Sequence, residues 1–129
     1  MAKPQVTLML DSGALIAAGK GRKVESIVRR WREADAQFLI GTPSLAEAIR
    51  DGPTDAAANR LIKTIDQVAA TTEAIARSAG ALLGQARSDK TIDAIIVATA
   101  DHCHATDILT SDPDDMRLFA GGRINILSL

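Results

Sequence analysis

Short apolar runs alternate with amphipathic segments along nearly the whole chain, and this alternation constrains the fold more than any other feature. The β-prone runs lie at 6–10, 37–40, 65–69, 107–110 and 124–127. Helix-like segments lie between them at 14–18, 22–34, 43–50, 54–63, 72–87, from Ser88 or Thr91 to 100, and at 113–119. Strands that alternate with helices predict an α/β fold, with helices on both faces of a central parallel sheet of four to five strands.

The core of such a fold has to be built from aliphatic side chains. The 129 residues include one Trp, two Phe and no Tyr, although 47% of the residues are hydrophobic. Ala, Leu, Ile and Val suit helices that pack closely on a parallel sheet. No internal repeat, linker or low-complexity stretch interrupts the pattern. We therefore expect a single domain over residues 1–129.

The sequence also predicts a soluble, cytoplasmic protein. Residues Met1 to Gln5 lack the apolar segment of a secretory leader. No apolar run approaches the roughly 20 residues that span a bilayer, so no membrane association is expected. Cys103 is the single cysteine, which means that an intrachain disulfide cannot form.

Charge is distributed unevenly, although the net charge is only −1. A basic segment contains Lys20, Arg22, Lys23, Arg29, Arg30 and Arg32, and a later acidic stretch contains Asp89, Asp93, Asp101, Asp107, Asp112, Asp114 and Asp115. A basic helix and an acidic cluster on one domain favour binding of a polyanion and of a cation, respectively. The alternative is a solvated helix face together with ordinary loop aspartates.

Carboxylates fall where an α/β sheet usually binds its ligands, beyond the carboxyl ends of the strands. Asp11 follows the first predicted strand, and Asp112 follows the strand at 107–110. Glu47 lies early in the helix after the second strand, and Asp93 lies at the start of a later helix. Four carboxylates at one edge repel one another unless a cation binds between them. Oxygen ligands alone suit Mg²⁺ or Mn²⁺.

Each of these carboxylates also has a purely structural interpretation. Asp11 is placed to cap the helix after it, and Glu47 stands three positions after Ser44, as in a capping box. Asp93 suits the positive end of a helix dipole, and Asp112 before Pro113 is typical of a turn. What these interpretations leave unexplained is the convergence of all four residues on one predicted edge.

Other sites and fold families fit the residues less well. His102 and His104 flank Cys103, but two positions on a helix separate their directions by about 200°, and no second pair completes a zinc site. A response-regulator receiver needs a paired acid beside its first strand, and a haloacid-dehalogenase-like phosphatase needs Asp-x-Asp there. This chain has Asp11-Ser12-Gly13.

Four short segments in order resemble the motifs of the PIN-domain nucleases: 10–17 (LDSGALIA), 42–47 (TPSLAE), 93–100 (DAIIVATA) and 109–112 (LTSD). Within that family, the length of the chain makes it similar to the VapC-like toxins of type II toxin–antitoxin systems. The resemblance implies a PIN-like three-layer α/β/α fold. It also implies a hydrolase that uses Mg²⁺ or Mn²⁺ to cleave RNA phosphodiester bonds, as an endoribonuclease acting on a structured RNA such as tRNA or rRNA.

The resemblance also assigns roles to residues. The catalytic and metal-binding carboxylates that it implies are Asp11, Glu47, Asp93 and Asp112. Ser12 and Thr110 would support the site, and Asp114 or Asp115 would assist, with the choice between the two left open. Gly13 departs from the family, because many relatives carry a second hydroxyl residue at this position.

The resemblance further implies partners. These are a cognate VapB-like antitoxin, an RNA substrate and a second copy of the chain in a homodimer. Basic side chains expected to guide the RNA backbone, by contacts that carry no sequence information, are Arg22, Lys23, Arg29 and Arg30. The alternative function is a PIN-like module that binds RNA or a protein without catalysis.

Overall fold

Five strands form one parallel sheet at the centre of the molecule. The computed structural model describes residues 4–129, so part of the amino-terminal segment that lacks a leader pattern lies outside it. The strands are β1 (Thr7–Leu10), β2 (Gln37–Gly41), β3 (Gln67–Ala69), β4 (Asp107–Thr110) and β5 (Asn125–Ser128). Their order in the sheet is β3-β2-β1-β4-β5, and every neighbouring pair is parallel. The predicted parallel sheet is therefore confirmed.

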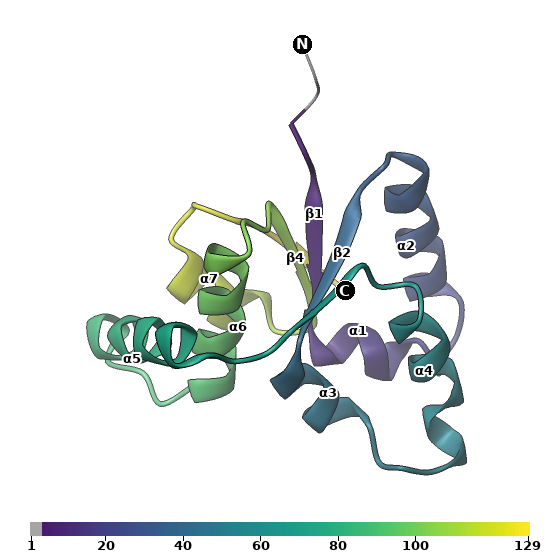
Figure 1. The fold of residues 1–129 in the computed structure, drawn as a ribbon, viewed down its shortest axis with the longest axis horizontal. Helices are drawn as coiled ribbons and strands as arrows, with labels where there is room; N and C mark the ends of the chain where they lie inside the picture. The colour runs from purple at the N-terminus through teal and green to yellow at the C-terminus, as the bar shows by residue number, and fades with distance from the viewer. Residues whose placement is uncertain (1–3) are drawn as a thin grey trace.

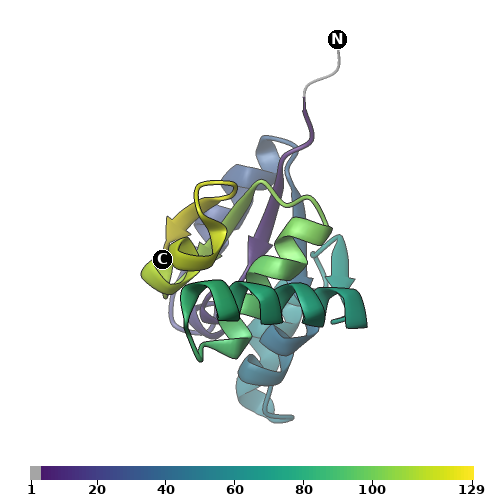
Figure 2. The ribbon, with the colours of Figure 1, turned by 90° about the vertical axis from the view of Figure 1, so that its left-hand side faces the viewer.

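Helices cover both faces of this sheet (Figure 1). They are α1 (Ser12–Ala17), α2 (Lys23–Glu33), α3 (Thr42–Ala48), α4 (Ala56–Ile62), α5 (Glu73–Ala86), α6 (Thr91–His102) and α7 (Pro113–Ala120), with a 3₁₀ turn at Pro53–Asp55. The turned view shows α5 and α6 lying together on one face (Figure 2). No helix among residues 4–129 is both long and apolar enough to cross a membrane.

The core is mainly aliphatic and lies on both faces of the sheet. Met9, Leu39 and Ile108 pack with buried residues of α5, α6 and α7. Leu8 and Phe38, one position away on the same strands, pack instead with residues of α1 and α2. Side chains alternate between the faces of a strand, so a sheet covered on both sides needs continuous apolar runs. This explains why the strands were recognisable as short uninterrupted apolar segments.

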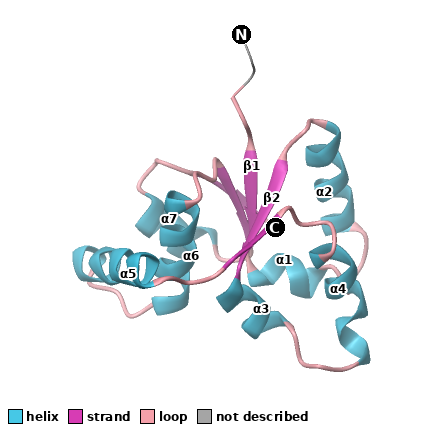
Figure 3. Cartoon of the chain, in the orientation of Figure 1, coloured by secondary structure: helices cyan, strands magenta, loops and turns pink. Residues whose placement is uncertain are grey.

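The order of the strands reverses beside β1, and α/β folds usually bind their ligands at such a position. The chain runs from β1 to β2 and β3 on one side, then returns to pair β4 with the other side of β1. Figure 3 shows the helices that begin at the carboxyl ends of these strands, α1 and α3 among them. The point where strand order reverses leaves a crevice at which α/β folds bind ligands. Here that crevice lies between the ends of β1 and β4.

The start of α3 differs from the prediction. The helix expected at 43–50 instead begins at Thr42 and ends at Ala48, and Gly41 is its N-cap in an extended conformation. Pro43 lies in the first turn, where its missing N–H is not needed. Ser44 is fully buried inside the helix, and its hydroxyl has no hydrogen-bond partner among residues 4–129. The capping-box interpretation of Glu47 is therefore wrong, because Ser44 does not cap this helix.

Candidate metal centre

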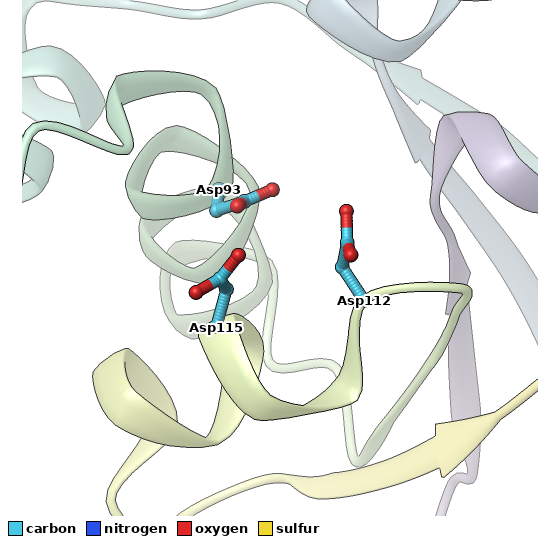
Figure 4. A group of neighbouring side chains, drawn as sticks. All are labelled: Asp93, Asp112 and Asp115. Carbon is cyan, nitrogen blue, oxygen red and sulfur yellow. The ribbon is translucent and has the colours of Figure 1, made fainter.

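Three aspartates meet at the carboxyl ends of β1 and β4. Asp93 lies in the first turn of α6, Asp112 is the N-cap of α7, and Asp115 lies in the first turn of α7. One ligand oxygen from each lies within 4.8 Å of the other two. Figure 4 shows the three carboxylates directed toward a common space between α6 and α7. Three oxygens at this separation can share one ion.

The structure distinguishes Asp115 from its neighbour Asp114, which the sequence did not. The side chain of Asp114 is fully exposed and lies 3.5 Å from a guanidinium nitrogen of Arg117. Asp115 is half-buried and joins the cluster. The phase of α7 explains the difference, since Met116 and Phe119 are buried and Asp115 precedes Phe119 by one helical turn. The spacing itself can be read from the sequence, but which face of α7 is buried depends on the packing of the folded chain.

Asp11 lies beneath this cluster in a network of hydrogen bonds. It is only 4% exposed, and as the N-cap of α1 it accepts the Ser12 N–H at 2.6 Å. The Thr110 hydroxyl donates to its other carboxylate oxygen at 2.8 Å and accepts the Asp112 N–H at 2.9 Å. Burial raises the pKa of Asp11 despite these donors. The Asp11 side chain therefore has two roles: it caps α1, and it belongs to the carboxylate cluster.

Repulsion among the carboxylates is concentrated on Asp93. Burial, followed by the negative charges of Asp11, Asp115, Asp112 and Glu47, raises its pKa to about 6. The predicted quartet thus shares one electrostatic environment, with Asp115 as a fifth member. Glu47 is exposed at its rim. Asp93 does lie in the first turn of α6, where a negative charge is favourable, but this position alone does not account for the other carboxylates around it.

The donor set fits a hard divalent cation. All five members are carboxylates, which offer the oxygen ligands that Mg²⁺ and Mn²⁺ prefer. A cation would also relieve the excess negative charge that raises the pKa of Asp93. Asp93, Asp112 and Asp115 are the residues placed to hold it directly.

The four basic residues expected to guide RNA do not gather in one place. Arg22 and Lys23 stand together at the start of α2. Arg29 lines a groove between α2 and α4. Arg30 instead lines a hollow beside Val6, at the amino end of β1 and so at the opposite edge of the sheet from the carboxylates. A single RNA path along all four is therefore not supported by their placement.

The groove between α2 and α4 has a volume of about 400 Å³. Apolar side chains and charged or polar ones line it: Ala18, Glu25, Val28, Arg29, Arg32, Ala57, Arg60, Leu61 and Thr64. Glu25 lies 3.4 Å from Arg29, while the Arg32 guanidinium stacks 4.7 Å above the Phe38 ring. The groove thus combines an apolar surface with a mainly cationic rim. Sequence reasoning did not connect Arg60 with it, because Arg60 comes from a different helix.

Comparison with known proteins gives similarity at the level of the fold. No family sequence model and no curated protein sequence matches the chain. Among solved structures, VapBC2 from Rickettsia felis bound to a DNA fragment from its promoter aligns with a TM-score of 0.75 at 12% identity, covering 96% of this chain and 99% of that one. A toxin–antitoxin complex from Klebsiella pneumoniae aligns with a TM-score of 0.72 at 20% identity, covering 94% and 96%.

The first two structures are toxin–antitoxin complexes, whereas a third solved structure is of a VapC toxin. Mycobacterium tuberculosis VapC20, a toxin that cleaves the sarcin–ricin loop, aligns with a TM-score of 0.60 at 16% identity over 89% of this chain and 95% of that one. The chain has the VapC fold. The PIN-like three-layer architecture expected from the sequence is thus confirmed, and the VapC fold spans nearly the full length of the chain. Within it, the carboxylate cluster lies where the strand order reverses.

Proposed function

We propose that the chain is a metal-dependent endoribonuclease and the toxin of a toxin–antitoxin pair. The observation that carries this proposal is the approach of Asp93, Asp112 and Asp115 to within 4.8 Å at the crevice of a VapC fold. Without a cation, repulsion among carboxylates at this edge of the sheet would only destabilise the folded protein. The similarity to a toxin that cleaves the sarcin–ricin loop supports a structured RNA as the substrate.

The proposed reaction is hydrolysis of an RNA phosphodiester. Bound Mg²⁺ or Mn²⁺ would supply Lewis-acid stabilisation of the charge that develops on the phosphate. Asp93, Asp112 and Asp115 would hold the cation. Asp11 fixes the backbone of Asp112 through hydrogen bonds that both residues make with the Thr110 hydroxyl. Glu47, exposed at the rim, orients the attacking water. A new bond forms between the water oxygen and phosphorus while the P–O3′ bond breaks, and one proton of the water ends on the leaving 3′ oxygen, which leaves a 5′-phosphate and a 3′-hydroxyl.

The test is cleavage of total bacterial RNA by purified protein in Mn²⁺ or Mg²⁺, with new 5′-phosphate ends mapped by sequencing. Asp115→Asn should abolish the cuts, as should EDTA. Asp114→Asn is the matched control, because that neighbouring carboxylate is fully exposed and lies outside the cluster. It should cleave like the wild type. If the wild type makes no cut above the Asp115→Asn background, the chain is a binding module with an idle site.

The α2–α4 groove is the proposed binding surface for the antitoxin. An amphipathic segment with acidic residues matches its apolar surface and its cationic rim. Reversing the charge of Arg32 and Arg60 together should weaken inhibition of cleavage by a co-expressed VapB-like antitoxin. The variant should retain cleavage in the absence of that antitoxin, because both residues lie outside the carboxylate cluster.

We further propose that residues 1–129 act as one cytoplasmic domain that forms a homodimer. The parallel sheet includes strands from both halves of the sequence, which supports a single folding unit. Light scattering should give a mass of twice 13.6 kDa. A monomeric mass across micromolar concentrations would contradict the dimer and leave the nuclease proposal unaffected.

A further inference from the structure

The turn that carries Asp112 lies directly on the backbone of α1. A Cβ atom built on Gly13 would collide with the Ser111 hydroxyl, and it would lie 3.0 Å from the Ser111 Cβ and 3.3 Å from the Ser111 nitrogen. The last of these contacts is with backbone, which cannot rotate away as a side chain can. The absence of a side chain at Gly13 therefore allows the turn between β4 and α7 to pack against the first turn of α1.

A second contact fixes the other side of the same turn. Thr110 is fully buried, and its hydroxyl links the Asp11 carboxylate to the Asp112 N–H. Asp112 itself is exposed and makes no side-chain capping hydrogen bond to α7. The position of its carboxylate therefore depends on where the turn holds its backbone. Ser111, between Thr110 and Asp112, is the residue that meets Gly13.

We infer that Gly13 is a positioning residue for the metal centre, acting through Ser111 on Asp112. This inference rests on the proposed function, because it assumes that Asp112 binds a cation. In this chain the Ser111 hydroxyl can rotate away from a Cβ at position 13, but the Ser111 Cβ and backbone nitrogen can relieve their contacts only by a small shift of the residue, which moves the adjacent Asp112 relative to Asp93 and Asp115. The glycine thereby sets the spacing of the three carboxylates.

Two other helical glycines have no such neighbour, so the close contact is specific to Gly13. Gly80 and Gly84 lie within α5, and a Cβ on either of them would meet nothing within 4 Å. Alanine at Gly80 should therefore be tolerated and should slightly favour the helix. Gly80→Ala is the matched control for Gly13→Ala, because both substitutions add one methyl group to a helical glycine.

The experiment measures Mn²⁺ affinity by calorimetry on purified full-length protein. Gly13→Ala should weaken binding about tenfold, as expected when a residue that orients a metal ligand is disturbed. Gly80→Ala should bind like the wild type. Adding Ser111→Gly to Gly13→Ala removes the colliding side chain, so the double variant should recover part of the lost affinity. Recovery would show that the loss in the single variant comes from the contact between position 13 and Ser111.

A second readout follows the turn without metal. The ¹H–¹⁵N resonance of Asp112 reports on the N–H that Thr110 accepts, and it should move in Gly13→Ala but not in Gly80→Ala. Equal Mn²⁺ affinity in Gly13→Ala and the wild type would overturn the inference, as would an unmoved Asp112 resonance. A wild type that binds no Mn²⁺ would instead overturn the proposed function.

Discussion

At the scale of single residues, the Thr110 hydroxyl links the buried core to the carboxylate cluster. It donates to a buried carboxylate and accepts a backbone N–H. Thr110→Val keeps the shape and removes both bonds. We expect a loss of about 1–3 kcal/mol in the free energy of unfolding, because Asp11 keeps its buried charge with one donor fewer. Urea unfolding measures the loss, and calorimetry should show weaker Mn²⁺ binding.

Thr106→Val is the matched control for that prediction. Thr106 also donates to a neighbouring aspartate, Asp107, and accepts a backbone N–H, but it lies at the amino end of β4. The control should lose stability while keeping its affinity for Mn²⁺. An equal loss of affinity in both variants would show that Thr110 acts only through general stability.

Asp93 predicts a pH dependence with opposite signs for stability and for metal binding. Its pKa is raised to about 6, so the folded protein holds a proton that the unfolded chain loses near 3.8. This group's contribution to stability in metal-free protein should therefore fall as pH rises from about 4 through 6. Mn²⁺ binds the deprotonated form, so its affinity should fall about tenfold per pH unit below 6.

Calorimetry of Mn²⁺ binding between pH 5 and 7.5 checks this expectation, with Asp93→Asn as the control for stability. Asp93→Asn should remove the decrease in the free energy of unfolding that is expected between about pH 4 and pH 6. An affinity that stays constant down to pH 5 would mean that Asp93 is already ionised there.

The sequence predicted four of the five carboxylates and left the fifth ambiguous. Asp11, Glu47, Asp93 and Asp112 were recognisable because strand ends and helix starts are local features. The choice of Asp115 over Asp114 depends on which face of α7 is buried, which is decided by packing against distant residues. The contact between Gly13 and Ser111 was not predictable, since it joins segments about 100 positions apart in the chain.

At the scale of elements, the basic residues of α2 lie near different edges of the sheet, so they are expected to have different roles. Arg22 and Lys23 begin the helix, whereas Arg30 faces the opposite edge of the sheet. If RNA crosses the carboxylate edge, Arg22→Ala with Lys23→Ala should reduce the slope of log affinity against log salt by about one to two. Arg30→Ala should leave the slope unchanged. Equal slopes in all three proteins would exclude phosphate contacts by Arg22, Lys23 and Arg30.

Element boundaries were predicted best where burial and pattern agree. The limits of β4 match the sequence prediction, because the strand is buried along its whole length. The helix expected at 54–63 instead starts as a 3₁₀ turn at Pro53–Asp55. Asp55 there accepts the N–H groups of Arg50 and Gly52, which ties the preceding loop to the helix start. This pairing forms only in the folded loop and leaves no periodic signal.

At the scale of the whole molecule, a bound cation should stabilise the entire fold. Mn²⁺ at one hundred times its dissociation constant should add about 2.7 kcal/mol to the free energy of unfolding, if the unfolded chain does not bind it. For a domain of this length, we expect the Tm to rise by roughly 10 °C. Calorimetry should show this rise in the wild type and in Asp114→Asn, and its absence in Asp115→Asn. A similar rise in Asp115→Asn would place the ion elsewhere.

The architecture was predictable although sequence identity to the matched structures is only 12–20%. Alternating apolar runs and helices dictate a parallel sheet, and aliphatic composition dictates close packing on both faces. Neither feature depends on particular residues being retained. The α2–α4 groove was not predictable, because its shape depends on how two helices separated by β2 and α3 settle beside each other.

The bond between Thr110 and Asp11 spans 99 positions of the chain, and this distance has a consequence for synthesis. A ribosome has to complete the chain through Asp115 before the carboxylate cluster can assemble. The residues that line the α2–α4 groove all lie between Ala18 and Thr64, so they emerge much earlier. If the proposed function and the proposed antitoxin surface hold, translation delivers the segment that the antitoxin would bind before the carboxylate cluster exists, so the inhibitor could bind the nascent chain before the chain is able to cleave RNA.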